Sequence, residues 1–243
     1  MKIGVDLGGT NLVAGVVNEA YEIVAKVRCK TRADGSSEEI MQDIARLCRE
    51  AAEKAGVTIE EIESVGIGVP GTCNMKTGIV EYVNNLNFEN VPLVQRMNEM
   101  LHIPVYIGND ASAAALGEAL AGAARDVNSC VCITLGTGVG GGIVIDGKIY
   151  EGCNYAGGEL GHTVIQMNGE PCKCGRSGCW EMYASATALV RQTKHAMETH
   201  PRTLMWQLAD GKLENVNGRT AFDAMRAGDM VGAAVVDHTR DRM

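Results

Sequence analysis

The sequence predicts an α/β protein with two domains, and three observations support this class. The chain has 243 residues, 46% of them hydrophobic and 30 of them glycine, which is typical of a globular protein rich in turns. Strand-like runs alternate with segments of helical periodicity. A strand, a glycine-rich turn and a second strand occur near residues 3–17 and again near 130–145. This repeat predicts domains 1–110 and 111–243, with a hinge near residues 110–112.

The first domain is expected to begin with a hairpin, a third strand and a helix. The segment KIGVDLGGTNLVAGVVN contains two alternating runs separated by a Gly-Gly-Thr turn, and EIVAKVRCK follows as the third strand. Ser36 and Glu39 fit a capping box, and apolar residues at helical spacing behind them predict a helix that reaches about Ala55.

The rest of the first domain is predicted to be a strand, a helix and a further strand. SVGIGVPG has the composition of a buried strand, and Pro92 suits the first turn of a helix in PLVQRMNEMLH. PVYIGND is a strand whose carboxyl end carries Asn109 and Asp110. These two residues are therefore placed at the predicted hinge.

The second domain is expected to repeat the pattern and then become helical. ASAAALGEALAGAA predicts a helix of small residues. SCVCITLGTGVGGGIVIDGKIY again predicts a strand, a glycine turn and a strand, with Asp146 and Gly147 as a hairpin signal. A segment dense in cysteine and glutamate, residues 157–181, comes next, and the tail from Glu181 has a mostly helical pattern.

Charge and hydropathy limit the partners of the protein. The net charge is −8, and no stripe of lysine and arginine is present, which argues against nucleic acid as a partner. No apolar run approaches the roughly 18 residues that cross a bilayer, and the N-terminus leads directly into a strand. We therefore expect a soluble, cytoplasmic protein without a membrane partner.

The nine cysteines divide into two groups. Three of them have the spacing C-x-C-x4-C, which favours a metal over disulfides in a reducing compartment. The other six are expected to be small buried hydrophobic residues: Cys29, Cys48, Cys73, Cys130, Cys132 and Cys153.

Both glycine turns have the composition of a phosphate cradle. In DLGGTN and LGTGVGGG, backbone N–H groups of residues without Cβ atoms can donate to phosphate oxygens, and Asp6 can hold Mg²⁺ directly or through water. The alternative is a purely structural role, since glycine turns join many hairpins. Two such turns in one chain favour a functional site in which both turns close on the same polyphosphate.

Asp110 and the segment 157–181 are the other candidates for chemistry. An aspartate at the carboxyl end of a strand can accept a proton from a substrate hydroxyl, although Asp110 would also suit the N-cap of the next helix. The cysteine-rich segment supplies the Cys₃His set that tetrahedral Zn²⁺ prefers: His162, Cys172, Cys174 and Cys179. Four protein ligands leave no open position, so the zinc would be structural. The zinc would fix Glu159 and Glu181 as hydroxyl-binding groups. The alternative is a zinc site that only orders its own loop, with both glutamates solvated.

The motifs DLGGTN, GND, LGTGVGGG and GGELGH…CKCGRSGCWE together resemble the ROK family of bacterial sugar kinases and sugar-responsive repressors, up to about Asp237. The resemblance implies the actin-like ATPase (ribonuclease H-like) fold, with two domains around a central cleft. It implies Asp110 as the catalytic base and seven residues in the sugar site: Gly71, Asn85, Asn109, Asp110, Glu159, His162 and Glu181. The corresponding ATP-binding residues are Asp6, Gly8, Gly9, Thr10, Asn11, Gly136, Thr137 and Gly138.

By this resemblance we expect a hexokinase that transfers the γ-phosphoryl group of ATP to a hexose, with glucose as the first expected acceptor. Mannose, allose, fructose and N-acetylated hexosamines are alternative acceptors, because the same side chains would bind their hydroxyls. An alternative of another class is a zinc-ordered sugar-binding protein with little kinase activity. A third alternative, a regulator that acts through protein contacts alone, is supported by no feature of the sequence.

The two ends of the chain lead to further expectations. No helix-turn-helix segment precedes the first strand, which sets aside the DNA-binding repressor branch. Family members continue past the helix that begins near Asp229 into strands, a glycine-rich turn and a closing helix that hold adenosine. The second domain is therefore expected to be incomplete, ATP to bind weakly, and exposed apolar surface to favour a homodimer or higher oligomer.

Overall fold

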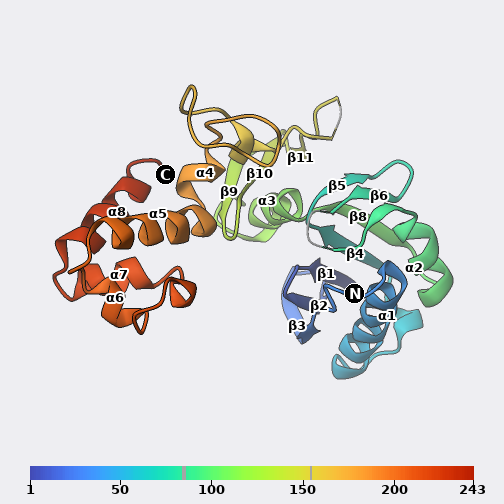
Figure 1. The fold of residues 1–243 in the computed structure, drawn as a ribbon. Coiled ribbons are helices and arrows are strands. Elements are labelled where there is room, and N and C mark those ends of the chain that lie inside the picture. The colour runs from blue at the N-terminus through green and yellow to red at the C-terminus, as the bar shows by residue number, and fades with distance from the viewer. Residues whose placement is uncertain (84–85, 154) are drawn as a thin grey trace. The chain divides into compact units, whose positions relative to one another are not determined.

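A computed structural model describes residues 1–83, 86–153 and 155–243 (Figure 1). Two compact units form within the chain. The first contains residues 1–132 and 142–158, and the second contains residues 133–141 and 159–243. The predicted division between residues 110 and 111 stays a prediction.

The first unit is built on a five-stranded mixed sheet. Its strands are β1 (Lys2–Leu7), β2 (Asn11–Val17), β3 (Ile23–Lys30), β4 (Ser64–Val69) and β8 (Val105–Asn109). The order is β3-β2-β1-β4-β8. β1, β2 and β3 are antiparallel neighbours, whereas β4 is parallel to both β1 and β8. The predicted hairpin, third strand and two later strands are confirmed.

Helices α1 (Ser37–Lys54) and α2 (Leu93–Leu101) begin close to where the sequence predicts. The Ser36 hydroxyl accepts a hydrogen bond from the Glu39 N–H at 3.3 Å, and the Glu39 carboxylate accepts one from the Ser36 N–H at 2.8 Å. This confirms the capping box, which satisfies donors that a helix start otherwise leaves unpaired. Pro92 is the N-cap residue of α2, one position before the first turn expected for it.

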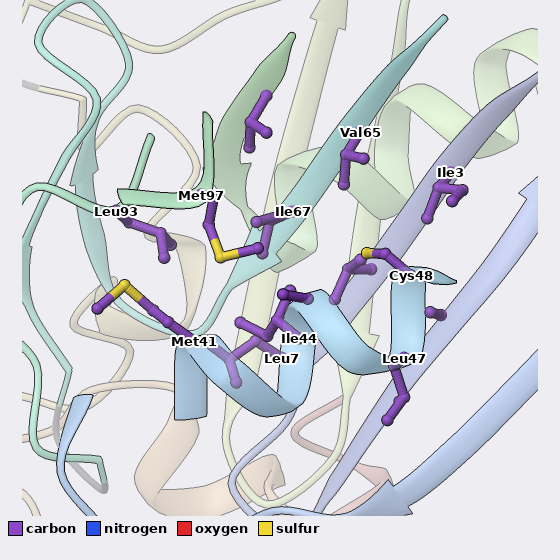
Figure 2. Packing of buried hydrophobic residues seen from close by; sticks show 14 of the residues in the cluster. Ile3, Leu7, Met41, Ile44, Leu47, Cys48, Val65, Ile67, Leu93 and Met97 are labelled. Carbon is purple, nitrogen blue, oxygen red and sulfur yellow. The ribbon is translucent and has the colours of Figure 1, made fainter. Parts of the chain in front are cut away.

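Both helices pack on one face of the sheet. Alternate residues of β1, including Ile3 and Leu7, are buried in one core with Ile44 of α1 and Met97 of α2 (Figure 2). Burial of one such side chain stabilises the fold by about 1.5–3 kcal/mol. The period-two pattern of β1 therefore fixes which face meets the helices, and the other face carries Gly4 and Asp6.

A small antiparallel sheet follows β4 that the sequence did not predict. Its strands are β5 (Thr72–Asn74), β6 (Ile79–Tyr82) and β7 (Glu89–Val91), in that order. Each has only three or four residues, too few to show an alternation of apolar and polar positions. β5 contacts β8, so this sheet borders the end of the parallel strands.

The second predicted repeat is confirmed. Helix α3 (Asp110–Ala121) is followed by β9 (Cys130–Leu135), β10 (Val139–Ile145) and β11 (Lys148–Ile149), which form a sheet of order β11-β10-β9. Asp146 and Gly147 have φ values of 50° and 73°. Two successive positive φ angles are what the tight hairpin between β10 and β11 requires.

The second unit has a helical core of its own. Its helices are α4 (Glu181–Ala184), α5 (Ala186–Thr199), α6 (Met205–Leu208), α7 (Thr220–Arg226) and α8 (Met230–Arg240). Met197 and Met205 are fully buried in this core, together with Ala221 of α7. The predicted helical tail is confirmed.

The prediction for the six scattered cysteines is only partly right. Cys48 and Cys73 are buried, whereas Cys29, Cys130 and Cys132 are half-buried and Cys153 is exposed. Cys130 and Cys132 lie in β9, whose side chains are only partly covered. Within the described ranges, the helices are too short or too polar for any of them to cross a membrane.

Candidate functional site

The carboxyl ends of the parallel strands bring the predicted base near Asp6. Asp6 of β1 is paired with Gly68 of β4, and Gly68 is paired with Gly108 of β8. Asp110 follows directly after β8, and a Cβ atom added to Gly68 would lie 3.4 Å from its Cα atom. This edge of a parallel sheet is where α/β proteins bind their ligands.

Asn109 is the N-cap of α3, and Asp110 is the first residue of the helix. The Asn109 side-chain oxygen accepts a hydrogen bond from the Ser112 N–H at 3.0 Å. The interpretation of Asp110 as the cap is therefore wrong, because its neighbour already fills that role. Asp110 accepts a hydrogen bond from the adjacent Ala111 N–H at 2.8 Å.

The environment of Asp110 raises the pKa of its carboxyl group. Burial is the main cause, the negative charge of Asp6 adds to it, and the hydrogen bond from Ala111 opposes it. The side chain reaches solvent in an open cavity, but protein atoms around it displace much of the water that would solvate the charge. A carboxylate with a raised pKa is a stronger base than an ordinary aspartate.

The cavity has a volume of about 790 Å³ and lies entirely within the first unit. Its lining includes Gly71, Asn109 and Asp110, three of the residues predicted for the sugar site. Gly71 has φ 146°, and a Cβ atom there would approach the Tyr82 carbonyl oxygen to 2.3 Å, so the position requires glycine. Asn85 lies outside the described residues. The volume is in the range of small-molecule sites.

The first glycine turn is held by hydrogen bonds to its carbonyl groups. The Gly8 N–H donates to the Asn11 carbonyl at 3.1 Å. The Thr31 hydroxyl donates to the Gly8 carbonyl at 2.6 Å, and the Thr31 N–H donates to the Thr10 carbonyl at 3.0 Å. A Cβ atom on Gly8 would meet the Asn11 oxygen at 2.7 Å, so the turn is closed around a glycine. Gly9 completes this turn between β1 and β2.

The second glycine turn is held in a similar way by the start of α5. The Ala186 N–H donates to the Gly136 carbonyl at 2.9 Å, and the Thr187 hydroxyl donates to the Thr137 carbonyl at 2.7 Å. The Gly136 N–H donates to the Gly138 carbonyl at 3.0 Å. In both turns a threonine hydroxyl thus fixes a carbonyl group, which supports the predicted likeness of the two hairpins.

Glu181 lies against the second glycine turn. Its Oε2 atom accepts a hydrogen bond from the Val139 N–H at 3.0 Å. A Cβ atom on Gly138 would lie only 2.3 Å from the same oxygen. Two residues predicted for different ligands, Gly138 for ATP and Glu181 for sugar, are therefore in direct contact.

Glu159 directly precedes a short 3₁₀ turn (Leu160–His162) that ends at His162 and packs on the start of β10. A Cβ atom on Gly161 would lie 2.0 Å from the Val139 carbonyl oxygen, so this turn reaches the strand only because residue 161 is glycine. The His162 Nε2 atom lies 3.9 Å from the Glu159 carboxylate. Val139 therefore brings the Glu159–His162 turn and Glu181 to the same part of the second unit.

The four predicted zinc ligands lie together. Their ligand atoms are all within 4.8 Å of one another: His162, Cys172, Cys174 and Cys179. The His162 Nδ1 atom is 3.5 Å from the Cys172 sulfur, and the Cys174 and Cys179 sulfurs are 3.5 Å apart. Tetrahedral zinc with Zn–S distances of about 2.3 Å would place its ligands about 3.8 Å apart. The donor set and its spacing therefore fit a Cys₃His zinc ion.

The loop geometry around these ligands depends on two glycines. Gly175 and Gly178 have φ values of 86° and 82°, in the left-handed region that favours glycine. Hydrogen bonds from the Arg176 N–H, the Arg176 side chain and the neighbouring thiols lower the pKa of Cys174 to about 6, whereas burial raises the pKa of Cys179 to about 12. A thiolate is the form that binds metal.

Most of the cavity lining, including two polar residues of one loop, was missed by the sequence analysis. Glu151 and Tyr155, in the segment after β11, line the same cavity as Asp110. No local motif marks them, because they reach the cavity only through the fold. The loop after a tight Asp-Gly hairpin is the one signal that could have drawn attention to them.

Comparisons with known proteins identify the family of this chain. The model of the ROK family matches residues 2–243. A glucokinase of Thermotoga maritima is 38% identical over 242 residues, which are 99% of this chain and 74% of that protein. A xylose repressor of Caldicellulosiruptor bescii is 33% identical over 210 residues, 86% of this chain and 53% of that protein.

The solved structures include a ROK family glucokinase from Streptomyces griseus in complex with glucose and AMPPNP. It has a TM-score of 0.82 and 36% identity, and the match covers 98% of this chain and 75% of that one. The predicted α/β fold of the actin-like ATPases is thereby confirmed. With a family model that spans nearly every residue and a glucokinase relative at 38% identity, the chain belongs to the ROK family.

Proposed function

We propose that this protein is a hexose kinase that transfers the γ-phosphoryl group of ATP to a sugar hydroxyl, with glucose as the preferred neutral acceptor. The observation that carries the proposal is the position of Asp110. It lies at the carboxyl end of β8 in an open cavity, near Asp6, and the helix cap is supplied by Asn109 instead. The similarity to glucokinases at 36–38% identity supports the same activity.

In the proposed reaction Asp110 takes the proton of the acceptor hydroxyl. The hydroxyl oxygen forms a bond to the γ-phosphorus, the bond from that phosphorus to the β,γ-bridging oxygen breaks, and ADP leaves. Mg²⁺ bound with the nucleotide would neutralise phosphate charge, and Asp6 is the carboxylate that we propose to hold it, directly or through water. The glycine turns at residues 8–11 and 136–138 are proposed to donate backbone N–H groups to phosphate oxygens.

Glu159, His162 and Glu181 are proposed to accept and donate hydrogen bonds to sugar hydroxyls. Their positions depend on the loop that the four zinc ligands would hold. We propose a structural zinc ion there, because the four protein ligands leave no open position for substrate. The His162 imidazole has its Nδ1 atom toward the cysteines and its Nε2 atom toward Glu159, so one ring can serve both purposes.

A coupled assay that follows ADP production with a panel of hexoses tests the proposal. We expect phosphorylation of glucose, with mannose, allose, fructose and N-acetylglucosamine as poorer acceptors. Calorimetry of glucose binding without nucleotide runs in parallel. Glucose binding without phosphorylation of any hexose would favour a sugar-binding protein over a kinase.

A further inference from the structure

The segment that follows β11 forms part of the cavity wall. Ile149, Glu151, Tyr155 and Gly158 line the cavity together with Asn109 and Asp110. All of these residues belong to the first compact unit. The side chains of Ile149, Glu151 and Tyr155 can therefore contact a ligand that the cavity binds.

A backbone hydrogen bond joins the two ends of this segment at Glu151. The Gly157 N–H donates to the Glu151 carbonyl oxygen at 2.9 Å. A Cβ atom on Gly157 would lie 2.8 Å from the Glu151 carbonyl carbon, so the two ends of the loop pass at backbone contact distance. The contact fixes the backbone from which the Glu151 side chain enters the cavity.

Tyr155 has an unfavourable backbone conformation. Its φ angle is 60°, in the left-handed region that a bulky aromatic residue rarely adopts. Glycine would adopt this conformation without cost. A tyrosine held in this way on the wall of a cavity points to a function for the ring, because strained residues gather at binding sites.

The cavity is acidic. Among the residues that the structure describes, the charged groups of the lining are three carboxylates and one ammonium: Asp6, Asp110, Glu151 and Lys26. Burial raises the pKa of Cys73, which also lines the cavity, to about 11, and the charges of Glu151 and Asp110 contribute. Glu151, Asp110 and Cys73 all line this one cavity.

We propose that Glu151 and Tyr155 select the acceptor sugar. The Glu151 carboxylate forms a charge-assisted hydrogen bond with a protonated amino group, so a hexose with a free amine is favoured over its N-acetylated or anionic counterpart. The Tyr155 ring packs against the apolar face of the sugar ring. This inference rests on the proposed function, in that the cavity with Asp110 is taken as the sugar site.

Sugar binding by calorimetry, without nucleotide, tests the role of Glu151. The sugars are glucose, glucosamine, N-acetylglucosamine and glucuronate at about pH 6.5, below the usual pKa of an amine. We expect glucosamine to bind more tightly than N-acetylglucosamine or glucuronate. Glu151→Gln should weaken glucosamine about tenfold and change glucose less than about twofold. Glu81→Gln is the matched control, since this exposed carboxylate of β6 also acts on Cys73 but does not line the cavity.

An unchanged ratio of glucosamine to glucose affinity in Glu151→Gln overturns the role of Glu151, and so does a failure of the parent to bind any sugar. Failure of the kinase proposal gives a different result. In that case sugars bind with the expected ratios, but the coupled assay detects no phosphorylation of any hexose.

The role of Tyr155 is tested by removing and restoring its ring. Tyr155→Gly should leave the midpoint of thermal unfolding equal or higher, because glycine adopts the left-handed backbone conformation without strain. It should also weaken the affinity for every sugar that binds about tenfold. Tyr155→Phe should retain sugar affinity. Asp146→Gly, another left-handed residue in the neighbouring hairpin, is the control that relieves a backbone without touching the cavity lining. Full sugar affinity in Tyr155→Gly overturns the contribution of the ring.

Discussion

The Glu181 carboxylate accepts a hydrogen bond from the Val139 N–H at 3.0 Å, directly after the second glycine turn. The same carboxylate oxygen occupies the space where a side chain on Gly138 would begin, 2.3 Å away. The residue proposed to bind a sugar hydroxyl is thus positioned by the turn proposed to bind phosphate. A substitution in the turn should therefore affect the Glu181 carboxylate, and a substitution of Glu181 should affect the turn.

Gly138→Ala should displace the Glu181 carboxylate. The φ angle of Gly138 is not in the left-handed region, so the backbone accepts alanine and the cost comes from the contact with Oε2. We expect a loss of stability of about 1–2 kcal/mol, from the broken hydrogen bond to Val139, and weaker sugar binding. Thermal unfolding and calorimetry with glucose measure the two effects.

Two further variants isolate this contact. Gly136→Ala is the control in the same turn, because a Cβ atom there meets nothing within 4 Å. In a Glu181→Ala background, Gly138→Ala should cost little more stability, since the clashing group is gone. Additive losses in the double variant would contradict the coupling.

Asp110→Asn should lower turnover by about 10²–10⁴-fold while glucose affinity stays close to that of the parent. The amide keeps an oxygen that can accept from Ala111, but it cannot take a proton. Because burial disfavours the ionised Asp110, the neutral variant should also be more stable at neutral pH. The gain should be no more than about 1 kcal/mol, since solvent in the cavity screens the charge.

Steady-state kinetics and thermal unfolding of Asp110→Asn provide the check. Turnover within about tenfold of the parent would mean that Asp110 does not act as the base. Asn98→Asp is a comparison variant with the reverse change, at a side chain that accepts from Val105 N–H away from the cavity lining. It should leave turnover unchanged.

The purified protein should contain one zinc ion per chain. Cys174→Ser should lose the metal and weaken sugar binding at the same time, because the loop would no longer hold Glu159 and Glu181. Metal content by mass spectrometry and sugar affinity by calorimetry are the measurements. Cys153→Ser, at an exposed cysteine outside the cluster, should change neither. If the zinc-free protein bound sugar as tightly as the parent, zinc would not be needed to position Glu159 and Glu181.

Asp229→Ala should destabilise the second unit by about 2 kcal/mol. The Asp229 carboxylate caps α8 by accepting from the Gly232 N–H at 2.7 Å, and it also accepts from the Leu204 N–H at 2.7 Å. Asp237→Ala is the control in the same helix, because Asp237 pairs with Arg240 at the surface and should contribute less than about 1 kcal/mol.

The contribution of Asp229 should depend on pH. Burial raises its pKa, but the hydrogen bonds that it accepts outweigh burial, so the folded-state pKa lies below the ordinary value of 3.8. The stabilisation is complete above the unfolded-state pKa and is lost as the pH falls through the folded-state pKa. The midpoints of parent and Asp229→Ala should therefore converge in acid. A constant difference down to the lowest pH would contradict this role.

Much of the fold could be predicted from local signals in the sequence. The capping box at Ser36 and Glu39 and the Asp146–Gly147 turn are set by neighbouring residues, and both are found where predicted. The small sheet β5-β6-β7 was missed, because strands of three or four residues are stabilised by their neighbours more than by their own composition.

The candidate site was predictable to the extent that its residues lie in motifs. The spacing of Cys172, Cys174 and Cys179 indicated a metal cluster, and the structure brings them together with a histidine. Asn109 caps the helix in place of Asp110, which the sequence could not show because both residue types are good caps. Glu151 became a candidate only when the fold brought its loop to the cavity.

The face of the large sheet opposite α1 and α2 carries glycines at positions 4 and 66, and both line the cavity. An added Cβ atom at either would meet no atom within 4 Å, so neither glycine is required by packing. Alanine there would reduce backbone freedom in the unfolded chain and take up part of the open space. The room for the proposed acceptor can therefore change by single methyl groups without disturbing the core on the other side of the sheet. Such a scaffold suits the redesign of acceptor preference, because the room for the ligand and the stability of the domain are set by opposite faces.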